Sequence, residues 1–327
     1  MAIYRHTPCK IKKMNSFLND VITGLSADFK HLDSKYFYDK KGDEIFQHIM
    51  QCEEYYLTNS EMEIFSEQSK LIVDVVLEKV NKIDIIELGP GDVSKSRHLL
   101  NEFLQRDSLG TYFPIDISEN IIELLKHTLP TNLPGIKVNG LNGDYLEMLP
   151  VANKTSANRK LILLLGGNIG NFNSEELKIF LRKLRKNISV NDIVLIGFDI
   201  KKNPNKILAA YSDKEGHTKA FNLNLLSRIN RELNGDFVLN NFEHFAMYNP
   251  ESGECKSFLI SLRDQEVNIG KHKFLFAKDE PIFMEVSKKY SVKEIDSICV
   301  DHGFWPLAKF MDSNKYFLDA LWICPSQ

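Results

Sequence analysis

The chain has 327 residues, of which 43% are hydrophobic and 26% charged, the balance of an ordinary globular protein with room for two domains. The formal net charge is −3 at pH 7. Proteins that bind nucleic acids through their phosphates are usually basic, so we expect no nucleic-acid partner. No apolar run reaches 18 residues, and the N-terminal sequence lacks the apolar core of a secretory signal. We therefore expect a cytoplasmic protein with no membrane partner.

The cysteines and histidines indicate the redox environment and whether a metal site is present. The five cysteines are scattered without a C-x-x-C pair, which indicates free thiols in a reducing compartment. The nine histidines form no H-x-x-x-H or H-E-x-x-H pattern, so the sequence predicts no metal site. The oligomeric state has no sequence signature here, and we expect a monomer.

An aromatic-rich stretch lies near the N-terminus, from Ser34 to Thr58. Aromatic side chains spaced as in a helix most often build a hydrophobic core, and this is the plain interpretation of the stretch. Its aromatic residues include Tyr36, Phe37, Tyr38, Phe46, Tyr55 and Tyr56.

From about Ser60 the chain alternates between predicted helices and strands. Residues 61–79 have helical periodicity. Ser118 is the predicted N-cap of a later helix, and Pro130 lies past its end. Asn173 and Glu176 form a predicted capping box at the start of another helix. Nearly all-apolar strands separated by helices predict a parallel sheet covered on both faces. The predicted strands are 83–88, 111–116, one within 135–144, 160–167 and 192–200. The other predicted helices are 94–105, one between Ser118 and Pro130, and 173–187.

Near the C-terminus the alternation of predicted helices and strands ends. Two apolar stretches flank the turn sequence DSN at 312–314, which predicts an antiparallel hairpin closing the sheet edge, with Trp305 and Trp322 in its core. The predicted fold class is therefore α/β, with a parallel sheet, an antiparallel C-terminal hairpin and a second lobe. We expect the sheet domain at 60–200 and 288–327. The second domain is expected at 1–59 and 201–287, where the chain looks loop-rich, aromatic and helical.

Polar or glycine-rich sequence follows each predicted strand, where ligands bind in open α/β sheets. Gly89 and Gly91 follow the first strand, Asp116 ends the second, and Asp144 with Tyr145 follows the third. Glycines allow close backbone approach, an acid suits a ribose diol, and the Asp-Tyr pair suits an adenine. Each feature also has a purely structural explanation: the glycines can form ordinary turns, and an acidic residue can stabilise the N-terminus of the helix that follows. Together they favour a nucleoside ligand.

The type of nucleoside follows from a missing residue. The full G-x-G-x-x-G of dinucleotide sites needs a third glycine, but Ser94 stands there, so a pyrophosphate cradle is not indicated. The pattern favours S-adenosylmethionine over NAD. The fourth strand runs into Gly166 and Gly167, with Asn171 just before the next helix, which suggests that something sits very close to the backbone.

The ordered motifs resemble a known family, the histidine-specific, S-adenosylmethionine-dependent methyltransferases, which make Nα-trimethylhistidine (hercynine) for ergothioneine biosynthesis. The resemblance covers about Phe17 to Trp322 and implies a two-lobed enzyme, with a Rossmann-like class I methyltransferase sheet in one lobe and the amino-acid substrate held by the other. It also implies S-adenosylmethionine as the cofactor and a small-molecule substrate, the amino acid L-histidine. The motifs are KYFYDKKGDEIF, EEYYLTNSE, ELGPG, FPIDIS, NGDY, GNIGNF, AYSDKEGHTKAFN, NRELNGDF and FMEVSKKY.

The resemblance also implies roles for particular residues. The cofactor residues are Gly89, Lys95, Asp116, Asp144 and Tyr145, joined by Gly91 and by Tyr38, which contacts both ligands. For the histidine substrate, the resemblance implies that Phe46 forms an aromatic wall, and that Tyr55 and Glu285 contact the imidazole with Ser287 beside Glu285. It implies that Asn171 and Tyr211 hold the amine and carboxylate. We count Asn171, Tyr38 and Tyr211 as catalytic, and Gly166 as leaving room for substrate.

Three departures from the family pattern keep alternatives open. Gly167-Asn168 replaces Ser-Thr, Ser212 replaces an acid, and Ser257 stands where the best-known members have a methionine lining the imidazole pocket. One alternative is an N-methyltransferase for another amino acid or a tryptophan-like amine. A silent sensor of S-adenosylmethionine or histidine, and an NAD-dependent oxidoreductase, are further alternatives.

Overall fold

The computed structural model describes residues 8–326, with side chains from residue 16 onward. The first residues of the N-terminal sequence used to judge a secretory signal lie outside this range. Among the described residues, Cys52, Cys255, Cys299 and Cys324 are free thiols, whereas the side chain of Cys9 is not described. Every helix of the described part is too short or too polar to cross a membrane.

The chain divides into two compact units. Unit 1 comprises Met1–Tyr55 and Asn203–Ser287, and unit 2 comprises Tyr56–Lys202 and Lys288–Gln327. Each unit has its own hydrophobic core and is described by itself.

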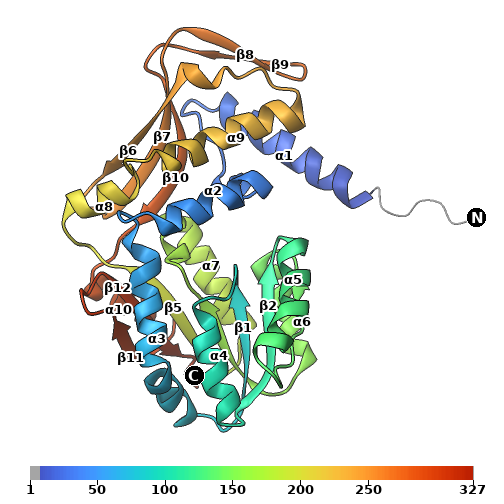
Figure 1. Ribbon diagram of the computed structural model, residues 1–327, viewed down its shortest axis with the longest axis vertical. Coiled ribbons are helices and arrows are strands. Elements are labelled where there is room, and N and C mark those ends of the chain that lie inside the picture. The colour runs from blue at the N-terminus through green and yellow to red at the C-terminus, as the bar shows by residue number, and fades with distance from the viewer. Residues whose placement is uncertain (1–7, 327) are drawn as a thin grey trace, which may run out of the picture. The chain divides into compact units, whose positions relative to one another are not determined.

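Unit 2 is built on one sheet of seven strands, several of which are labelled in Figure 1. Its strands are β1 (Ile83–Leu88), β2 (Leu109–Asp116), β3 (Leu141–Asn142), β4 (Arg159–Leu164), β5 (Ile193–Asp199), β11 (Trp305–Met311) and β12 (Phe317–Ile323). The strand order is β11-β12-β5-β4-β1-β2-β3. Strands β1 to β5 pair in parallel, while β12 pairs antiparallel with both β5 and β11. This arrangement confirms the predicted α/β sheet with an antiparallel C-terminal hairpin at its edge.

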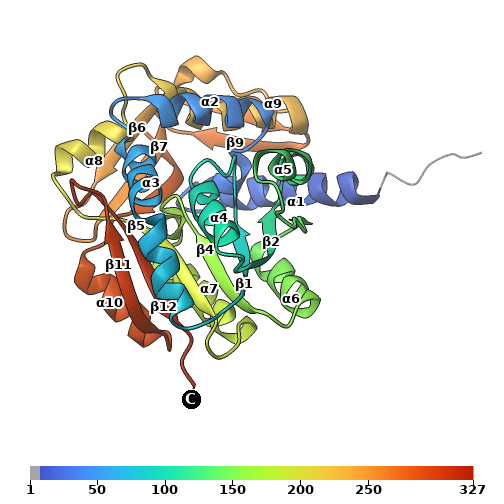
Figure 2. The ribbon, with the colours of Figure 1, turned by 60° about the horizontal axis from the view of Figure 1, so that its bottom comes forward.

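Helices cover both faces of this sheet (Figure 2). The helices are α3 (Tyr56–Leu77), α4 (Ser96–Gln105), α5 (Glu119–Asn132), α6 (Tyr145–Thr155), α7 (Ser174–Asn187) and α10 (Val292–Asp301), with a 3-10 turn η2 (Asn168–Asn171). Side chains of α3, α4 and α5 share one core with one face of the strands, and those of α6, α7 and α10 share a second core with the other face. Strand β1 supplies Ile85 to the first core and Ile86 to the second, as expected when successive side chains alternate.

Three details of unit 2 differ from the sequence prediction. Pro130 lies inside α5, because a proline in the last turn removes only one hydrogen bond before the helix ends. The third strand is reduced to two residues, Leu141–Asn142. Trp322 is buried as predicted, but Trp305, the first residue of the edge strand β11, is 61% exposed. A strand at the sheet edge has a neighbouring strand on one side only, so its end is less covered than that of a central strand.

A buried acid inside the sheet makes stability depend on pH. Glu87 on β1 is 3% exposed and accepts a 2.6 Å hydrogen bond from the Tyr112 hydroxyl on β2. Burial raises the pKa of Glu87 to about 7, against the opposing effects of the Tyr112 hydrogen bond and the Lys95 charge. Between the ordinary pKa of 4.5 and this value, the folded protein holds more protons than the unfolded chain.

We therefore expect Glu87→Gln to flatten the dependence of stability on pH. In the parent protein, ionising Glu87 should lower the free energy of unfolding by about 3 kcal/mol as the pH rises from about 4.5 to above 7. Glutamine keeps an acceptor for Tyr112 but does not ionise. Urea unfolding at pH 5 and pH 8 measures the difference, and an equal loss in the parent and the variant would contradict the assignment.

Unit 1 combines helices with a small antiparallel sheet. Its helices are α1 (Pro8–Ser26), α2 (Lys40–Gln51), α8 (Pro204–Ala210) and α9 (His217–Leu233), with 3-10 turns η1 (Ser34–Tyr36) and η3 (Leu239–Asn241). Its strands are β6 (Phe242–Tyr248), β7 (Glu254–Ser261), β8 (Gln265–Ile269), β9 (His272–Phe276) and β10 (Pro281–Lys288). Helices α2 and α9 pack side by side (Figure 1). One sheet has the order β10-β7-β6, and β8 and β9 form a separate hairpin.

The expectation that 201–287 is loop-rich and helical was wrong for its second half, which forms these five strands. The period-two pattern was hidden by polar and small residues at inward positions. In β7 the inward side chains are Cys255, Ser257, Leu259 and Ser261, of which only Leu259 is strongly apolar. A strand whose buried face contains serines looks like a loop in a hydrophobicity pattern.

Candidate functional site

In unit 2, the predicted cofactor residues gather at one edge of the sheet. In the registers of the pairs β1–β2 and β2–β3, Leu88 lies opposite Ile115 and Asp116 lies opposite Asn142. Gly89, Asp116 and Asp144 therefore follow neighbouring strand ends, at the carboxyl edge where ligands bind in sheets of this kind.

The turn after β1 requires glycine. Gly89 has φ +72°, and a Cβ atom there would lie 2.5 Å from the Tyr145 hydroxyl. Gly91 also has a left-handed φ, +57°, with open space around its Cβ position. The backbone of this turn thus lies close to the Tyr145 side chain from α6, with no side chain of its own between them.

The two acids at the strand ends also have structural roles. Asp116 accepts the Ser118 N–H at 2.8 Å, and Asp144 caps α6 by accepting the Leu146 N–H at 2.9 Å. Burial raises the pKa of Asp116. A carboxylate accepts several hydrogen bonds, so these local contacts are compatible with holding ligand hydroxyl or amine groups.

Lys95 lies in a buried ionic cluster that the sequence interpretation missed. The fully buried Glu61 of α3 pairs with the Lys95 ammonium and accepts the Gly166 N–H with both carboxylate oxygens, at 2.8 and 2.9 Å. Burial lowers the pKa of Lys95, but the Glu61 charge and hydrogen bond outweigh it and the pKa is raised. Glu61 thus ties the turn after β4 to the residue that caps α4. No local sequence signal marked Glu61, which lies in an ordinary helical pattern.

Asn171 lies at the end of η2, on an exposed position before the capping box of α7. The turn begins at Gly167, with φ +70°. Gly170 is packed against the last residue of β10, since a Cβ atom there would lie 2.6 Å from the Lys288 carbonyl oxygen. The backbone that carries Asn171 is therefore held by contacts on both sides of the asparagine.

In unit 1, four of the predicted substrate residues form a row of aromatic contacts. The ring centroids of Tyr38 and Phe46 lie 5.7 Å apart, those of Phe46 and Tyr55 6.2 Å, and those of Tyr55 and Tyr211 6.5 Å. Phe221 of α9, which was not predicted, packs against Tyr38 and Phe46. The plain interpretation of the aromatic stretch, a packed core, therefore holds for part of it, while Tyr38 remains 44% exposed.

The last ring of this row is joined to β10. The buried Tyr211 hydroxyl donates a 2.8 Å hydrogen bond to the Ser287 hydroxyl. Glu285 is half-buried two residues earlier on the same strand, so its side chain lies on the same face as Ser287. The structure therefore brings Tyr55, Tyr211, Glu285 and Ser287 into one region of unit 1, although they come from three separate stretches of sequence.

Ser257 lies on the other face of this sheet. The rings of Phe258 on β7 and Phe283 on β10 are in contact, with centroids 5.8 Å apart, so these residues share a face that also carries Glu285. Ser257, one residue from Phe258, is 1% exposed on the opposite face. The interpretation of Ser257 as part of the imidazole wall beside Glu285 is therefore not supported, and its departure from the family pattern does not bear on that pocket.

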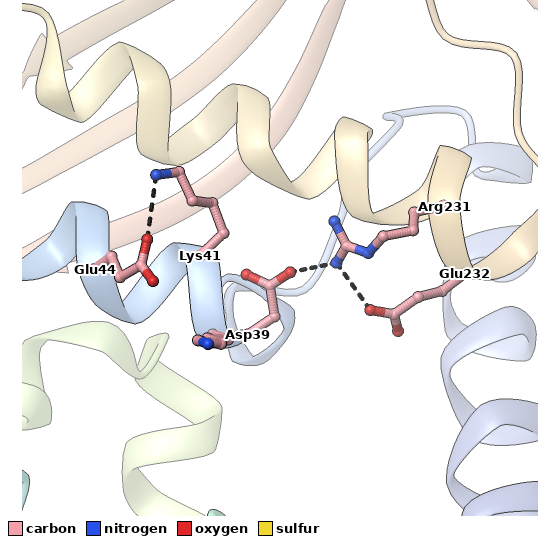
Figure 3. Close-up of a pocket in the computed structure, with 6 residues that line it drawn as sticks. Asp39, Lys41, Glu44, Arg231 and Glu232 are labelled. Atoms are coloured by element: carbon pink, nitrogen blue, oxygen red, sulfur yellow. Dashed lines mark hydrogen bonds and ion pairs between the residues drawn. The ribbon is translucent and has the colours of Figure 1, made fainter.

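A cavity of 320 Å³ in unit 1 contains none of the predicted site residues. Its lining carries three acidic and three basic side chains, which largely pair with one another (Figure 3). Asp39 and Glu232 both contact Arg231, at 2.5 and 3.0 Å, and Lys41 contacts Glu44 at 3.2 Å. A depression with balanced, mutually paired charges offers no distinct charge to a ligand.

Comparison with known proteins identifies the family. Residues 17–324 match the family described as histidine-specific methyltransferase, SAM-dependent. The histidine N-alpha-methyltransferase of Mycolicibacterium smegmatis is 31% identical over 286 residues, 87% of either chain. That of Mycobacterium tuberculosis is 32% identical over 83% of either chain.

A relative named for a different substrate is less similar to this chain. The L-tryptophan methyltransferase of Psilocybe serbica is 27% identical over 88% of this chain and 86% of its own. Since the family match spans most of the chain and the two histidine enzymes exceed 30% identity over most of their length, this protein belongs to the histidine-specific, S-adenosylmethionine-dependent methyltransferases.

Proposed function

We propose that this methyltransferase acts on the α-amine of L-histidine and that three successive transfers yield hercynine. The hydrogen bond between Tyr211 and Ser287, beside Glu285, is the observation that carries the proposal, because it gathers polar groups suited to an amino acid with a polar ring. The names of the two histidine N-alpha-methyltransferases support the same substrate.

The cofactor-facing residues fit S-adenosylmethionine. The turn at Gly89 leaves no room for a side chain beside Tyr145, and carboxylates follow the neighbouring strands. When bound, S-adenosylmethionine supplies a methyl group activated by its sulfonium. The residues that would hold it are Gly89, Gly91, Lys95, Asp116, Asp144 and Tyr145, with Tyr38 contacting both ligands.

The remaining residues would bind and orient the amino acid. Methyl transfer to nitrogen requires the neutral amine, and alignment of the reacting atoms can contribute ~7–11 kcal/mol to the rate. The Asn171 amide can accept from the amine and donate to the carboxylate. The Tyr211 hydroxyl has a single hydrogen, so it can donate to the substrate when the Ser287 hydroxyl donates to Tyr211 instead. Gly166 would leave space for the substrate.

The ring end of the substrate is assigned to Glu285 and Tyr55, with Ser287 beside them. An ionised Glu285 only accepts hydrogen bonds, which suits an imidazole N–H. Tyr38 and Phe46 would face the methylated ammonium, each cation–π contact contributing roughly 0.5–2 kcal/mol. No general base is required if the site selects the deprotonated amine.

The direct test is incubation with S-adenosylmethionine and L-histidine, followed by mass spectrometry. We expect a product carrying three added methyl groups, with one- and two-methyl species as intermediates. Tryptophan is the second candidate because of the Psilocybe relative. Methylation of tryptophan but not of histidine would replace the first proposal, and no product with any amino acid would favour a sensor. The cytoplasmic location and monomeric state stay predictions.

Glu285→Ala should weaken histidine binding selectively. Losing a hydrogen bond to a charged group costs about 1.5–3 kcal/mol, so the KM for histidine should rise by roughly 10- to 100-fold while that for S-adenosylmethionine stays unchanged. The matched control is Glu266→Ala, which removes a partly exposed glutamate of β8 that pairs with Lys273. If the KM for histidine moved equally in both variants, Glu285 would have no role in reading the imidazole.

A further inference from the structure

Three metal-binding side chains meet in unit 1. The thiol of Cys52, the carboxylate of Glu215 and the imidazole of His217 have ligand atoms that all lie within 4.8 Å of one another. Glu215 and His217 are already in contact, at 2.9 Å. The sequence interpretation found no metal site because it searched for short spacing motifs, whereas these donors come from two distant segments.

The local structure holds these donors in place. Cys52 is the C-cap of α2, and its backbone N–H binds the Ile49 carbonyl oxygen. On the other segment, the Asp213 carboxylate accepts the N–H groups of His217 and Thr218, each at 2.7 Å, at the start of α9. The His48 ring stacks on the His217 imidazole, with centroids 5.3 Å apart. The donors are thus pre-positioned by contacts outside the cluster.

The donor set suits zinc and chemically similar ions. Thiolate, imidazole and carboxylate are its usual ligands, and three of them leave a fourth tetrahedral position for water. Bond lengths of about 2.0–2.3 Å place tetrahedral ligand atoms roughly 3.3–3.6 Å apart, so the distances between the ligand atoms need to shorten by at most ~1.5 Å. The Glu215 side chain is 73% exposed and that of His217 28%, which gives an ion access from solvent.

The charge around the thiol also favours a cation. Besides Glu215, the carboxylates of Asp213 and Glu54 act on the Cys52 thiol through their negative charge. A divalent ion would neutralise that charge.

We propose that Cys52, Glu215 and His217 form a binding site for a divalent transition metal of the Zn²⁺ type. The ion would link the end of α2 to the loop between α8 and α9. Tyr55 follows Cys52 by three positions and Tyr211 precedes Glu215 by four, and the rings of these tyrosines are in contact. Metal binding would therefore brace both tyrosines. The metal site itself does not depend on the proposed substrate.

Titration of the chelator-treated protein with Co²⁺ tests the site directly. Thiolate ligation of Co²⁺ produces a charge-transfer absorption band, and we expect this band to saturate at one equivalent. It should vanish in Cys52→Ser and require at least ~10-fold more Co²⁺ in His217→Ala, given the typical loss on removing a metal-site partner. Cys255→Ser, which changes another buried thiol of unit 1, is the matched control and should retain the band.

A second measurement guards against misfolded variants. Zn²⁺ should raise the melting temperature of the parent protein, because a ligand that binds only the folded state stabilises it. It should not raise that of Glu215→Ala. This variant should fold normally, because the Glu215 side chain is 73% exposed. Absence of the Co²⁺ band in the parent, its survival in Cys52→Ser, or an equal Zn²⁺ stabilisation of Glu215→Ala would each overturn the proposal.

Discussion

Asn171→Ala is expected to lower kcat by roughly 10²- to 10³-fold, the range seen when a group that orients or stabilises the reacting centre is removed. Alanine keeps the backbone of η2 but loses the amide that would accept from the amine and donate to the carboxylate. Because Asn171 is exposed, the change should leave folding intact. Steady-state kinetics with histidine and S-adenosylmethionine measure the loss, and the KM for the cofactor should change little.

Asn168→Ala is the matched control for this variant. It removes the same amide from the first residue of the same turn, η2, and should retain turnover within a few-fold. Near-normal turnover in Asn171→Ala would remove that residue from the mechanism. Equal losses in both variants would show that the turn, rather than the Asn171 amide, controls the rate.

Glu61→Ala is expected to cause the largest loss of stability, about 3–5 kcal/mol in the free energy of unfolding. It leaves the Lys95 ammonium without its buried partner and the Gly166 N–H without its acceptor. The nearby Asp319 cannot substitute without cost, because burial raises its pKa well above the usual range and makes the ionised form unfavourable. Urea unfolding monitored by circular dichroism measures the difference.

Two further variants separate charge from hydrogen bonding at this position. Glu61→Gln keeps an acceptor for Gly166 but loses the ionic contact, so its stability should lie between those of the parent and the alanine variant. Glu67→Ala removes an exposed glutamate of the same helix and should change stability by no more than ~0.5 kcal/mol. Equal losses in Glu61→Ala and Glu67→Ala would show that the buried pair does not stabilise the fold.

Much of unit 2 could be predicted because its signals are local. Runs of apolar residues such as those of β1 and β5 can be buried only between two layers, and the capping box of Asn173 and Glu176 is complete within four residues. Where burial alternates with polar positions the prediction was weaker. The strands β6 to β10 were missed, and Trp305 was assigned to a core that the edge strand does not provide.

The sequence by itself determined the sheet, its antiparallel hairpin and the family, since these depend on periodicity and on motifs in a fixed order. Only the tertiary structure decided which distant residues meet. It paired Glu61 with Lys95 and Gly166, joined Tyr211 to Ser287, and placed Ser257 and Glu285 on opposite faces of one sheet. It also gathered Cys52, Glu215 and His217. Such contacts depend on how separate elements pack, which no local pattern of residues encodes.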